Sequence, residues 1–332
     1  MALNGKVMVT GGAGYIGSHA VLALCDAGYD VVVVDNLVTG FAWAVDPRAT
    51  LVEANVADDI AVRAAIRDHN VRAIMHFAGS VVVPESVSDP LKYYRNNTAA
   101  TRSLIESAVT EGVPHFIFSS TAATYGTPVK VPVEETDPTV PINPYGMSKL
   151  MTEAMLRDVA AAHPINYCAL RYFNVAGADP QGRSGQSTVG ATHLIKIAVV
   201  AATGKRAAVS VFGTDFDTPD GTGVRDYIHV SDLAAAHVAT LELLVAEPTQ
   251  SHTLNAGYNR GFSVNEVLDA VDRVTNMTIE RRYEGRRAGD PAALVADNRA
   301  ILAALPWRPQ RDDLDTIVKD ALAWERKLSE RQ

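Results

Sequence analysis

Along the first half of the chain, short runs of β-branched and other apolar residues alternate with longer amphipathic stretches. The short runs predict β-strands and the longer stretches predict helices. We expect strands at residues 6–10, 30–35, 51–56, 73–77, 115–119 and 167–173, and helices at residues 15–27, 58–70, 91–111 and 145–162. Strands that are separated by helices indicate an α/β fold with a parallel, doubly wound sheet. Four consecutive valines at 31–34 suit a strand that is covered on both faces.

The pattern changes after Phe173. Residues 174–190 are rich in Gly, Asp, Gln and Ser, and residues 213–223 are rich in Gly, Asp, Thr and Pro. Long loops of this kind in a folded chain are usually binding loops. We therefore predict a first domain of residues 1–174 and a smaller mixed α/β domain of residues 175–332 that caps the substrate. A segment at about 227–247 is expected to pack back on the first domain.

Composition narrows the classes of function. Of the 332 residues, 47% are hydrophobic and 20% are charged, which is typical of a soluble globular protein. The net charge is −8 and no run is rich in Lys or Arg, which argues against nucleic-acid binding. No apolar segment approaches the roughly 18 residues that span a bilayer, and the first residues lack the pattern of a signal peptide. Cys25 and Cys168 lie in apolar segments without metal-ligand spacing, so we expect reduced thiols, a cytoplasmic protein and no metal.

Residues 7–17, VMVTGGAGYIG, place three glycines between the first strand and the first helix. Gly11, Gly14 and Gly17 would let the backbone turn sharply and approach a pyrophosphate at the helix N-terminus. Their spacing only approximates the usual dinucleotide fingerprint. Asp35 ends the second strand 18 residues after Gly17, where its carboxylate would accept the ribose hydroxyls of NAD and repel the 2′-phosphate of NADP. The sequence therefore predicts a Rossmann-type domain with NAD as its cofactor.

Tyr145 and Lys149 lie four residues apart in the segment NPYGMSK. Asn143 is a favourable N-cap and Pro144 a favourable first residue, so a helix beginning here would present both side chains on one face. Deprotonating an alcohol while hydride leaves the same carbon requires a base, and free tyrosine has a pKa of about 10. A nearby ammonium and a positive nicotinamide ring would favour the phenolate, and a pKa lower by about three units would suit catalysis.

Three hydroxyl side chains, Ser119, Ser120 and Thr121, lie at the end of the strand HFIFSS, where open α/β sheets bind their ligands. Thr121 would share the proton of the reacting hydroxyl, and Lys149 would also donate to the nicotinamide ribose. The sequence thus predicts three catalytic residues, Tyr145, Lys149 and Thr121.

Eight segments carry a family resemblance over nearly the whole chain. They are TGGAGYIGSH (10–19), VVDNL (33–37), HFAG (76–79), ESV–DPL–YY–NN (85–97), FSSTAATYG (118–126), NPYGMSK (143–149), LRYFNVAGADP (170–180) and DGTGVRDYIHVSDLA (220–234). The chain resembles the extended short-chain dehydrogenase/reductase family, and within it the UDP-glucose 4-epimerases. The last three segments are typical of nucleotide-sugar epimerases.

The resemblance implies a reaction in which UDP-galactose and UDP-glucose are interconverted. Tyr145 would take the proton of the sugar 4-hydroxyl while NAD accepts the C4 hydride. The resulting 4-keto sugar would turn about its bond to the diphosphate and receive the hydride on its other face. NAD would be restored in each cycle and stay bound. A homodimer is also implied, with residues 91–111 and 145–162 of each subunit in a four-helix bundle, although apolar stripes on these helices could equally face the sheet.

The resemblance also implies site residues. Those expected at the cofactor are Gly11, Gly14, Tyr15, Ile16, Gly17, Asp35, Asn36, Asn55, Val56, Phe77, Ala78, Gly79, Asn96, Ser119, Tyr145, Lys149 and Tyr172. Those expected at the UDP-hexose are Ser120, Thr121, Tyr145, Phe173, Asn174, His193, Leu194, Phe212, Arg225, Arg287, Asp290 and Leu294. The two arginines would bind the diphosphate, since the planar guanidinium suits phosphate oxygens. The alternatives are that the arginines are solvated surface charges and that Phe212, a candidate wall for the uracil, is a core residue.

Four positions depart from the pattern of the relatives. Val81 stands where many carry a lysine that reaches the pyrophosphate, and Asn55 replaces an aspartate at the adenine. His193 stands where some have asparagine. Leu294 replaces the tyrosine of relatives that are strict for unacetylated sugars, so we expect room for a 2-acetamido group.

Three rival functions share parts of this pattern. A nucleotide-sugar 4,6-dehydratase would need an acid/base pair directly after Thr121, where this chain has Ala122 and Ala123. A non-catalytic NAD sensor would usually lack Tyr145 or Lys149. An enzyme acting on UDP-glucuronate stays open, because we cannot place its carboxylate site.

Overall fold

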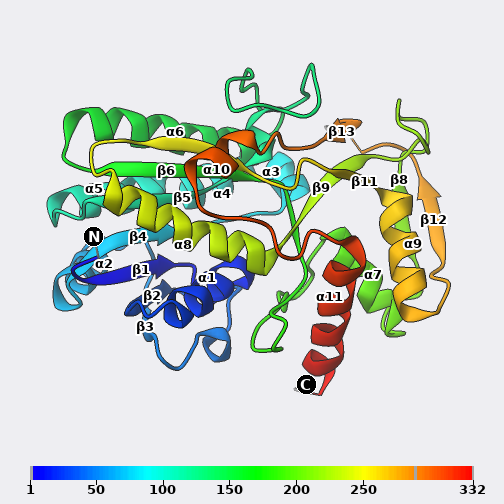
Figure 1. The fold of residues 1–332 in the computed structure, drawn as a ribbon, viewed down its shortest axis with the longest axis horizontal. Coiled ribbons are helices and arrows are strands. Elements are labelled where there is room, and N and C mark those ends of the chain that lie inside the picture. The colour runs from blue at the N-terminus through cyan, green and yellow to red at the C-terminus, as the bar shows by residue number, and fades with distance from the viewer. Residues whose placement is uncertain (1–2, 288–289, 331–332) are drawn as a thin grey trace.

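The alternating first half forms a parallel sheet in the computed structural model, which describes residues 3–287 and 290–330 (Figure 1). Its strands are β1 (Lys6–Thr10), β2 (Val31–Asp35), β3 (Thr50–Glu53), β4 (Val71–His76), β5 (His115–Thr121), β6 (Asn166–Tyr172) and β10 (His252–Ala256). They are all parallel and lie in the order β10-β6-β5-β4-β1-β2-β3. The six strands predicted from the sequence are present with bounds shifted by a few residues, and the predicted α/β fold with a Rossmann-type sheet is confirmed.

Both faces of this sheet are covered. Successive side chains of a strand point to opposite faces, so Val7 and Val9 of β1 pack in one core layer and Met8 packs in the other. The first layer is closed by α1 (Tyr15–Asp26) and α8 (Val230–Ala246). The second is closed by α2 (Asp59–Asp68), α5 (Ala100–Thr110) and α6 (Pro144–Ala162). The consecutive valines of β2 are all buried, as their apolar run indicated.

The second half of the chain returns to the first sheet. Helix α8 lies against α1, and the next strand, β10, pairs with β6 at the sheet edge (Figure 1). A division at residue 174 stays a prediction, since β10 joins a sheet whose other strands come before that residue.

The predicted continuous helix over 91–111 is wrong. The chain forms α3 (Val83–Ser88), α4 (Pro90–Tyr93), a π-helix, η2 (Tyr94–Ala99), and then α5. Single π-helical turns are often found at functional sites. This one carries Asn96 and Asn97, whose contacts are described below.

The remaining elements form a smaller unit beside the first sheet. Strands β7 (Asn174–Ala176), β9 (Val224–His229), β11 (Gly261–Ser263) and β13 (Ala293–Leu294) form one sheet, and β8 (Val209–Phe212) pairs with β12 (Arg281–Glu284). Helices α7 (Leu194–Ala202), α9 (Val264–Thr275) and α11 (Leu314–Ser329) enclose a separate apolar core. Short elements complete the chain: η1 (Ala42–Ala44), η3 (Ala122–Thr124) and α10 (Arg299–Ala304). Within the described ranges, no helix is both long and apolar enough to cross a bilayer.

Candidate active site

The glycine turn lies where the direction of strand order reverses, between β1 and β4. Gly11 has a φ of +71°, and a Cβ there would lie 2.5 Å from the backbone nitrogen of Ala78. A Cβ on Gly17 would lie 2.1 Å from the carbonyl oxygen of Gly11. Gly14 is the N-cap of α1 and supplies no side-chain acceptor, so the first turn of α1 keeps N–H groups for an anion. This cradle fits a dinucleotide pyrophosphate, which binds at such switch points.

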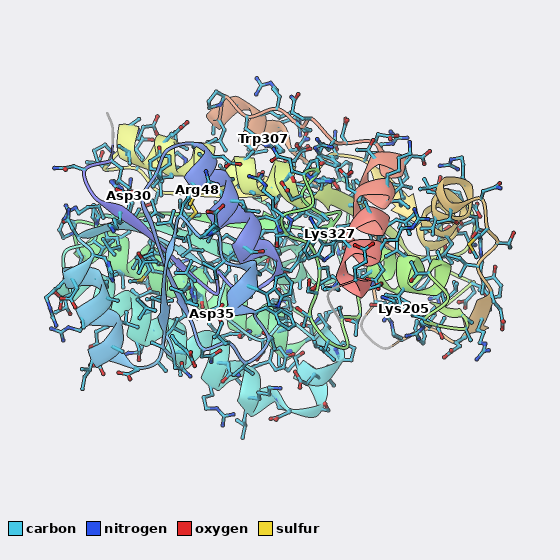
Figure 2. The ribbon with its side chains drawn as sticks, turned by 90° about the horizontal axis from the view of Figure 1, so that it is seen from below. Asp30, Asp35, Arg48, Lys205, Trp307 and Lys327 are labelled. Atoms are coloured by element: carbon cyan, nitrogen blue, oxygen red, sulfur yellow. The ribbon has the colours of Figure 1, made fainter. Side chains whose placement is uncertain are left out.

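Asp35 is buried at the end of β2 (Figure 2). Its Oδ2 accepts a hydrogen bond from the Ala13 N–H at 3.0 Å, and its Oδ1 accepts one from the Leu37 N–H at 2.8 Å. The carboxylate thus holds the glycine turn and still has lone pairs for ribose hydroxyls. Asn36 and Asn55 accept hydrogen bonds from N–H groups two residues further on and so shape their own turns.

Two further parts of the predicted cofactor channel lie beside this turn. Phe77 packs against His237 with 4.8 Å between ring centroids. Gly79 has a φ of +156°, and a Cβ there would lie 2.8 Å from Asn97 Oδ1. Val56 packs in the core layer under α2 and α5.

Asn97 holds the turn after β4 and was not predicted. Its Oδ1 accepts from the Ser80 N–H at 2.7 Å, and its Nδ2 donates to the Ser80 carbonyl and the Ser148 hydroxyl. Asn96, which was predicted, donates to the Ser80 hydroxyl at 3.1 Å. The two adjacent asparagines in the sequence could have indicated this role. Asn97, the buried one, joins the turn to Ser148 of α6.

Helix α6 begins where the sequence predicted. Asn143 caps it by accepting a hydrogen bond from the Gly146 N–H at 2.8 Å, and Pro144 is its first residue. Lys149 is buried one turn after Tyr145. Its Nζ donates to the Ser119 carbonyl oxygen at 2.9 Å and lies 4.9 Å from the centroid of the Phe118 ring. Tyr145, Lys149 and the end of β5 are therefore brought together.

Burial dominates the electrostatics of Tyr145 and Lys149. Burial raises its pKa, and an interaction with the Thr121 hydroxyl opposes that rise without overcoming it. Burial also lowers the pKa of Lys149 to about 8. The protein alone therefore keeps the phenol protonated, because a buried site disfavours the charged form of both groups.

Ser120 was expected at the substrate, and the structure corrects this. Side chains alternate along β5, so Ser119 and Thr121 share a face and Ser120 lies on the other. Ser119 hydrogen-bonds to the Tyr172 hydroxyl. Ser120 is fully buried and donates to Glu153, which forms a buried ion pair with Arg171. Its hydroxyl is therefore part of the protein interior.

The predicted UDP residues gather on the smaller unit. Arg287 forms an ion pair with Asp290 at 2.8 Å, and its guanidinium lies 4.7 Å from the centroid of the Phe212 ring. Arg225 is half-buried, and burial lowers its pKa while Asp290 opposes that change. Arginine on an aromatic ring beside a second arginine is suited to a nucleoside diphosphate.

Leu294 connects this group to the end of β5. It pairs with Arg225 across β13 and β9. Its side chain packs against a buried cluster that includes Ala122 and Phe173. The residue that was expected to limit sugar size therefore lies between the predicted nucleotide anchors and Thr121.

A small hollow of about 30 Å³, partly open to solvent, lies beside β7 and the loop that follows it. Its lining includes the predicted residues Tyr15, Asn174, His193 and Leu194, and also Trp324 of α11. The Tyr15 hydroxyl donates to the Gly177 carbonyl at 2.7 Å and closes one side. Among the described residues, no group of three or more His, Cys, Asp or Glu is arranged to hold a metal ion.

A family model and individual relatives show which known proteins this chain resembles. The model of the NAD dependent epimerase/dehydratase family matches residues 7–257. The chain belongs to this family. This match confirms the predicted family and its NAD cofactor, and the full-length relatives confirm the predicted enzyme class.

Individual relatives agree over the full length. A UDP-glucose 4-epimerase of Azospirillum brasilense is 53% identical over 99% of this chain and 94% of its own. The structure of a UDP-glucose 4-epimerase from Stenotrophomonas maltophila, with bound NAD and formylated UDP-arabinopyranose, is 37% identical, with a TM-score of 0.95 over 99% of this chain and 100% of its own. The UDP-Glc/GlcNAc 4-epimerase of Campylobacter jejuni is 44% identical, with a TM-score of 0.85 over 98% of this chain and 100% of its own.

Three histidines of this family member, His19, His76 and His237, are buried. His76, at the end of β4, is hydrogen-bonded to the hydroxyls of Thr10 and Thr101 at 2.6 and 2.7 Å. Burial lowers its pKa to about 3, with a smaller contribution from the Lys149 charge. Burial also lowers the pKa of His19 and of His237 to about 4.

We expect acid to destabilise the fold through these histidines. Each pKa is lower in the folded state than the ordinary value of about 6.5, so the unfolded chain binds more protons below that pH. The free energy of unfolding should therefore fall from about pH 6.5 towards pH 4, by at most about 4 kcal/mol per pH unit for three protons. Denaturant unfolding at several pH values measures this slope. His237→Asn should reduce this slope by the contribution of about one proton. His163→Asn changes a histidine at an exposed position and should leave the slope as it is. Equal slopes in the wild type and both variants would contradict the assignment.

Proposed function

We propose that the protein interconverts UDP-galactose and UDP-glucose through a transient 4-keto sugar, with Tyr145 as the acid/base group. The observation that carries the proposal is the pair of Tyr145 and Thr121 beside buried Lys149, at the switch point that holds the glycine cradle. The full-length similarity to UDP-glucose 4-epimerases supports the substrate class.

NAD would be held by the glycine turn, by Asp35 and by the turn that Asn97 fixes. When bound, it supplies a reversible hydride acceptor and a positive charge next to the phenol. That charge is what Tyr145 requires, because burial alone keeps its proton in place.

Each catalytic side chain then has a separate task. Tyr145 removes the proton of the sugar 4-hydroxyl and later returns it. Thr121, whose hydroxyl faces the phenol, bridges that proton to the substrate. Lys149 is fixed on the Ser119 carbonyl and presents its remaining donors towards the cofactor ribose.

The two predicted domains would bind different ligands. Residues 1–174 would bind NAD, and residues 175–332 would bind the UDP-sugar, with Arg225 and Arg287 on the diphosphate. Ala122 and Ala123 form η3 directly after Thr121 and carry no group that transfers protons, which favours epimerisation over dehydration.

We further propose a homodimer formed through α5 and α6, supported by exposed Leu91 and Met151 near these helices. A cytoplasmic location is also proposed, supported by two free thiols. Sedimentation equilibrium tests the dimer.

The purified protein incubated with UDP-galactose, without added cofactor, tests the reaction. We expect UDP-glucose to form with no net NADH, because the hydride returns to the sugar. A 4-keto-6-deoxy product, or turnover of UDP-glucuronate in place of UDP-galactose, would contradict the assignment.

Leu294 is predicted to admit acetylated sugars. We expect the wild type to epimerise UDP-N-acetylgalactosamine and Leu294→Tyr to lose about 10–200-fold in kcat/KM for it, since the larger ring fills the space of the acetamido group. Activity on UDP-galactose should be kept, and Leu294→Met, which conserves volume, should behave like the wild type on both sugars. Absence of wild-type turnover of the acetylated sugar would end this idea.

A further inference from the structure

The segment that follows β2 lies directly on the glycine turn. We call residues 37–44 the strap. The Phe41 N–H donates to the Ala13 carbonyl oxygen at 3.0 Å, and a Cβ on Gly40 would lie 2.8 Å from the Ala13 backbone. At its start, the Leu37 N–H donates to Asp35. Any movement of the strap would therefore disturb both the glycine turn and the Asp35 carboxylate.

Three aromatic rings join the strap to the C-terminal helix. Phe41 stacks on Trp43 with centroids 5.1 Å apart, and Trp43 stacks on Trp324 of α11 with centroids 6.2 Å apart. The interplanar angle is 29° in both pairs. Trp43 is 43% exposed, whereas Trp324 is 2% exposed. The stack thus runs from a surface segment at the cofactor cradle to a buried ring on α11.

Trp324 is held firmly on its own side. Its Nε1 donates to the Ser187 hydroxyl at 3.1 Å, and Gly185 lies so close that a Cβ there would be 2.2 Å from the indole ring. The next residue, Glu325, is buried and forms ion pairs with Lys196 and Lys205. These contacts anchor α11 to α7 and to the loop before it.

The same loop is tied to both ends of α1. The Ser184 hydroxyl is hydrogen-bonded to the Ser18 hydroxyl at 2.7 Å near the amino end. At the carboxyl end, Asp26 forms an ion pair with Arg183 of this loop at 2.9 Å, and a second one with Arg48, which precedes β3, at 2.7 Å. Lys327 of α11 donates to the Gly182 carbonyl at 2.6 Å. Among the described elements, the strap contains only the short helix η1 and no strand, so its position depends on its contacts with the glycine turn and with Trp324.

We propose that Phe41, Trp43 and Trp324 form an aromatic clasp that keeps the strap closed on the glycine turn and so slows the loss of bound NAD. The inference rests on the proposed function, in which the cofactor is restored in each cycle and has no need to leave. The three rings are positioning residues, because they act through the strap and the Asp35 carboxylate. Each stacked pair is expected to slow opening by about 2- to 10-fold.

The rate of NAD release from the loaded enzyme tests the clasp. The protein is loaded with NAD, freed of excess by gel filtration and diluted, and the NAD still bound is measured over time. We expect Trp43→Leu and Trp324→Leu each to release NAD faster, by up to about tenfold for the Trp43–Trp324 pair that both remove. The double variant should be no faster than Trp43→Leu, because that substitution already removes both stacked pairs. Trp43→Phe and Trp324→Phe keep a stacking ring and should stay near the wild type. Arg326→Leu, on the exposed side of α11, is the matched control.

Steady-state kinetics distinguish this positioning role from general damage to the fold. In the leucine variants, the NAD concentration for half-maximal rate should rise while kcat at saturating NAD stays within about twofold of the wild type. Unchanged release, or multiplicative effects in the double variant, would overturn the clasp. If Trp324→Leu fails to fold, Trp43→Leu at an exposed position removes the stack from the strap side and decides the matter. A wild type that neither binds NAD nor epimerises UDP-galactose would instead overturn the proposed function.

Discussion

Replacing Tyr145 with phenylalanine is expected to lower kcat for UDP-galactose by about 10²–10⁴-fold, the range supplied by a positioned acid/base group. The phenol is partly buried beside Thr121, and no other acid/base side chain is proposed to contact the sugar hydroxyl. NAD binding should survive, because the glycine cradle and Asp35 do not depend on the hydroxyl. Steady-state rates and bound NAD measured on the same preparation give both quantities.

Tyr93 provides the control for this variant. Its ring packs edge-on against Tyr145 with centroids 6.4 Å apart, and its hydroxyl donates to the Val82 carbonyl at 2.6 Å. Tyr93→Phe removes a hydroxyl from the same neighbourhood without touching the proposed proton path, so kcat should change only a few-fold. If Tyr145→Phe kept a tenth or more of the wild-type kcat, another group would have to be the base.

The sheet could be predicted from the sequence because its strands carry local signals. Runs such as VVVV are apolar for every residue, and the helix between two of them sets parallel pairing. The joining of β10 to β6 had no such signal, since β10 follows β6 by about 80 residues and the pairing is decided by packing of α8 on α1. The local sequence pattern thus predicts which residues form strands. It does not predict which strand a segment late in the chain, such as β10, will pair with.

The site shows the same limit at single residues. Tyr145, Lys149 and Asn143 were predictable because helix spacing and capping are local rules. Ser120 was misplaced although the two-residue period of a strand already puts it opposite Thr121. Its partner Glu153 lies 33 residues away on another element, so only the fold reveals it. Asn97 was missed for a similar reason, because a π-helix turns it towards Ser80 and Ser148.

The predicted shift of the Tyr145 pKa illustrates a third limit. The sequence suggested a lower pKa because it places an ammonium near the phenol and predicts a positive nicotinamide ring beside both. In the fold, Lys149 is also buried and its own pKa falls to about 8. Burial thus acts against the charge on both partners, and its extent cannot be read from residue spacing.

The ion pair of Arg171 and Glu153 is expected to be the most sensitive charged contact around the seven-stranded sheet. Arg171 lies in β6, and its Nε and Nη2 donate to Glu153 at 3.0 and 2.6 Å. Its Nη1 also donates to the Tyr125 hydroxyl at 3.0 Å. Both charged side chains are less than a tenth exposed, so each depends on the other for compensation.

We expect Arg171→Met to lower the free energy of unfolding by about 3–5 kcal/mol, because it leaves the Glu153 carboxylate buried without its partner. Glu153→Met combined with Arg171→Met should recover part of that loss, since no unpaired charge remains. Arg102→Ala breaks an exposed pair with Glu106 on α5 and should cost less than about 1 kcal/mol. Denaturant unfolding of the four proteins gives the comparison. A single Arg171→Met variant as stable as the wild type, or a double variant less stable than the single one, would mean that the pair contributes through packing and not through charge compensation.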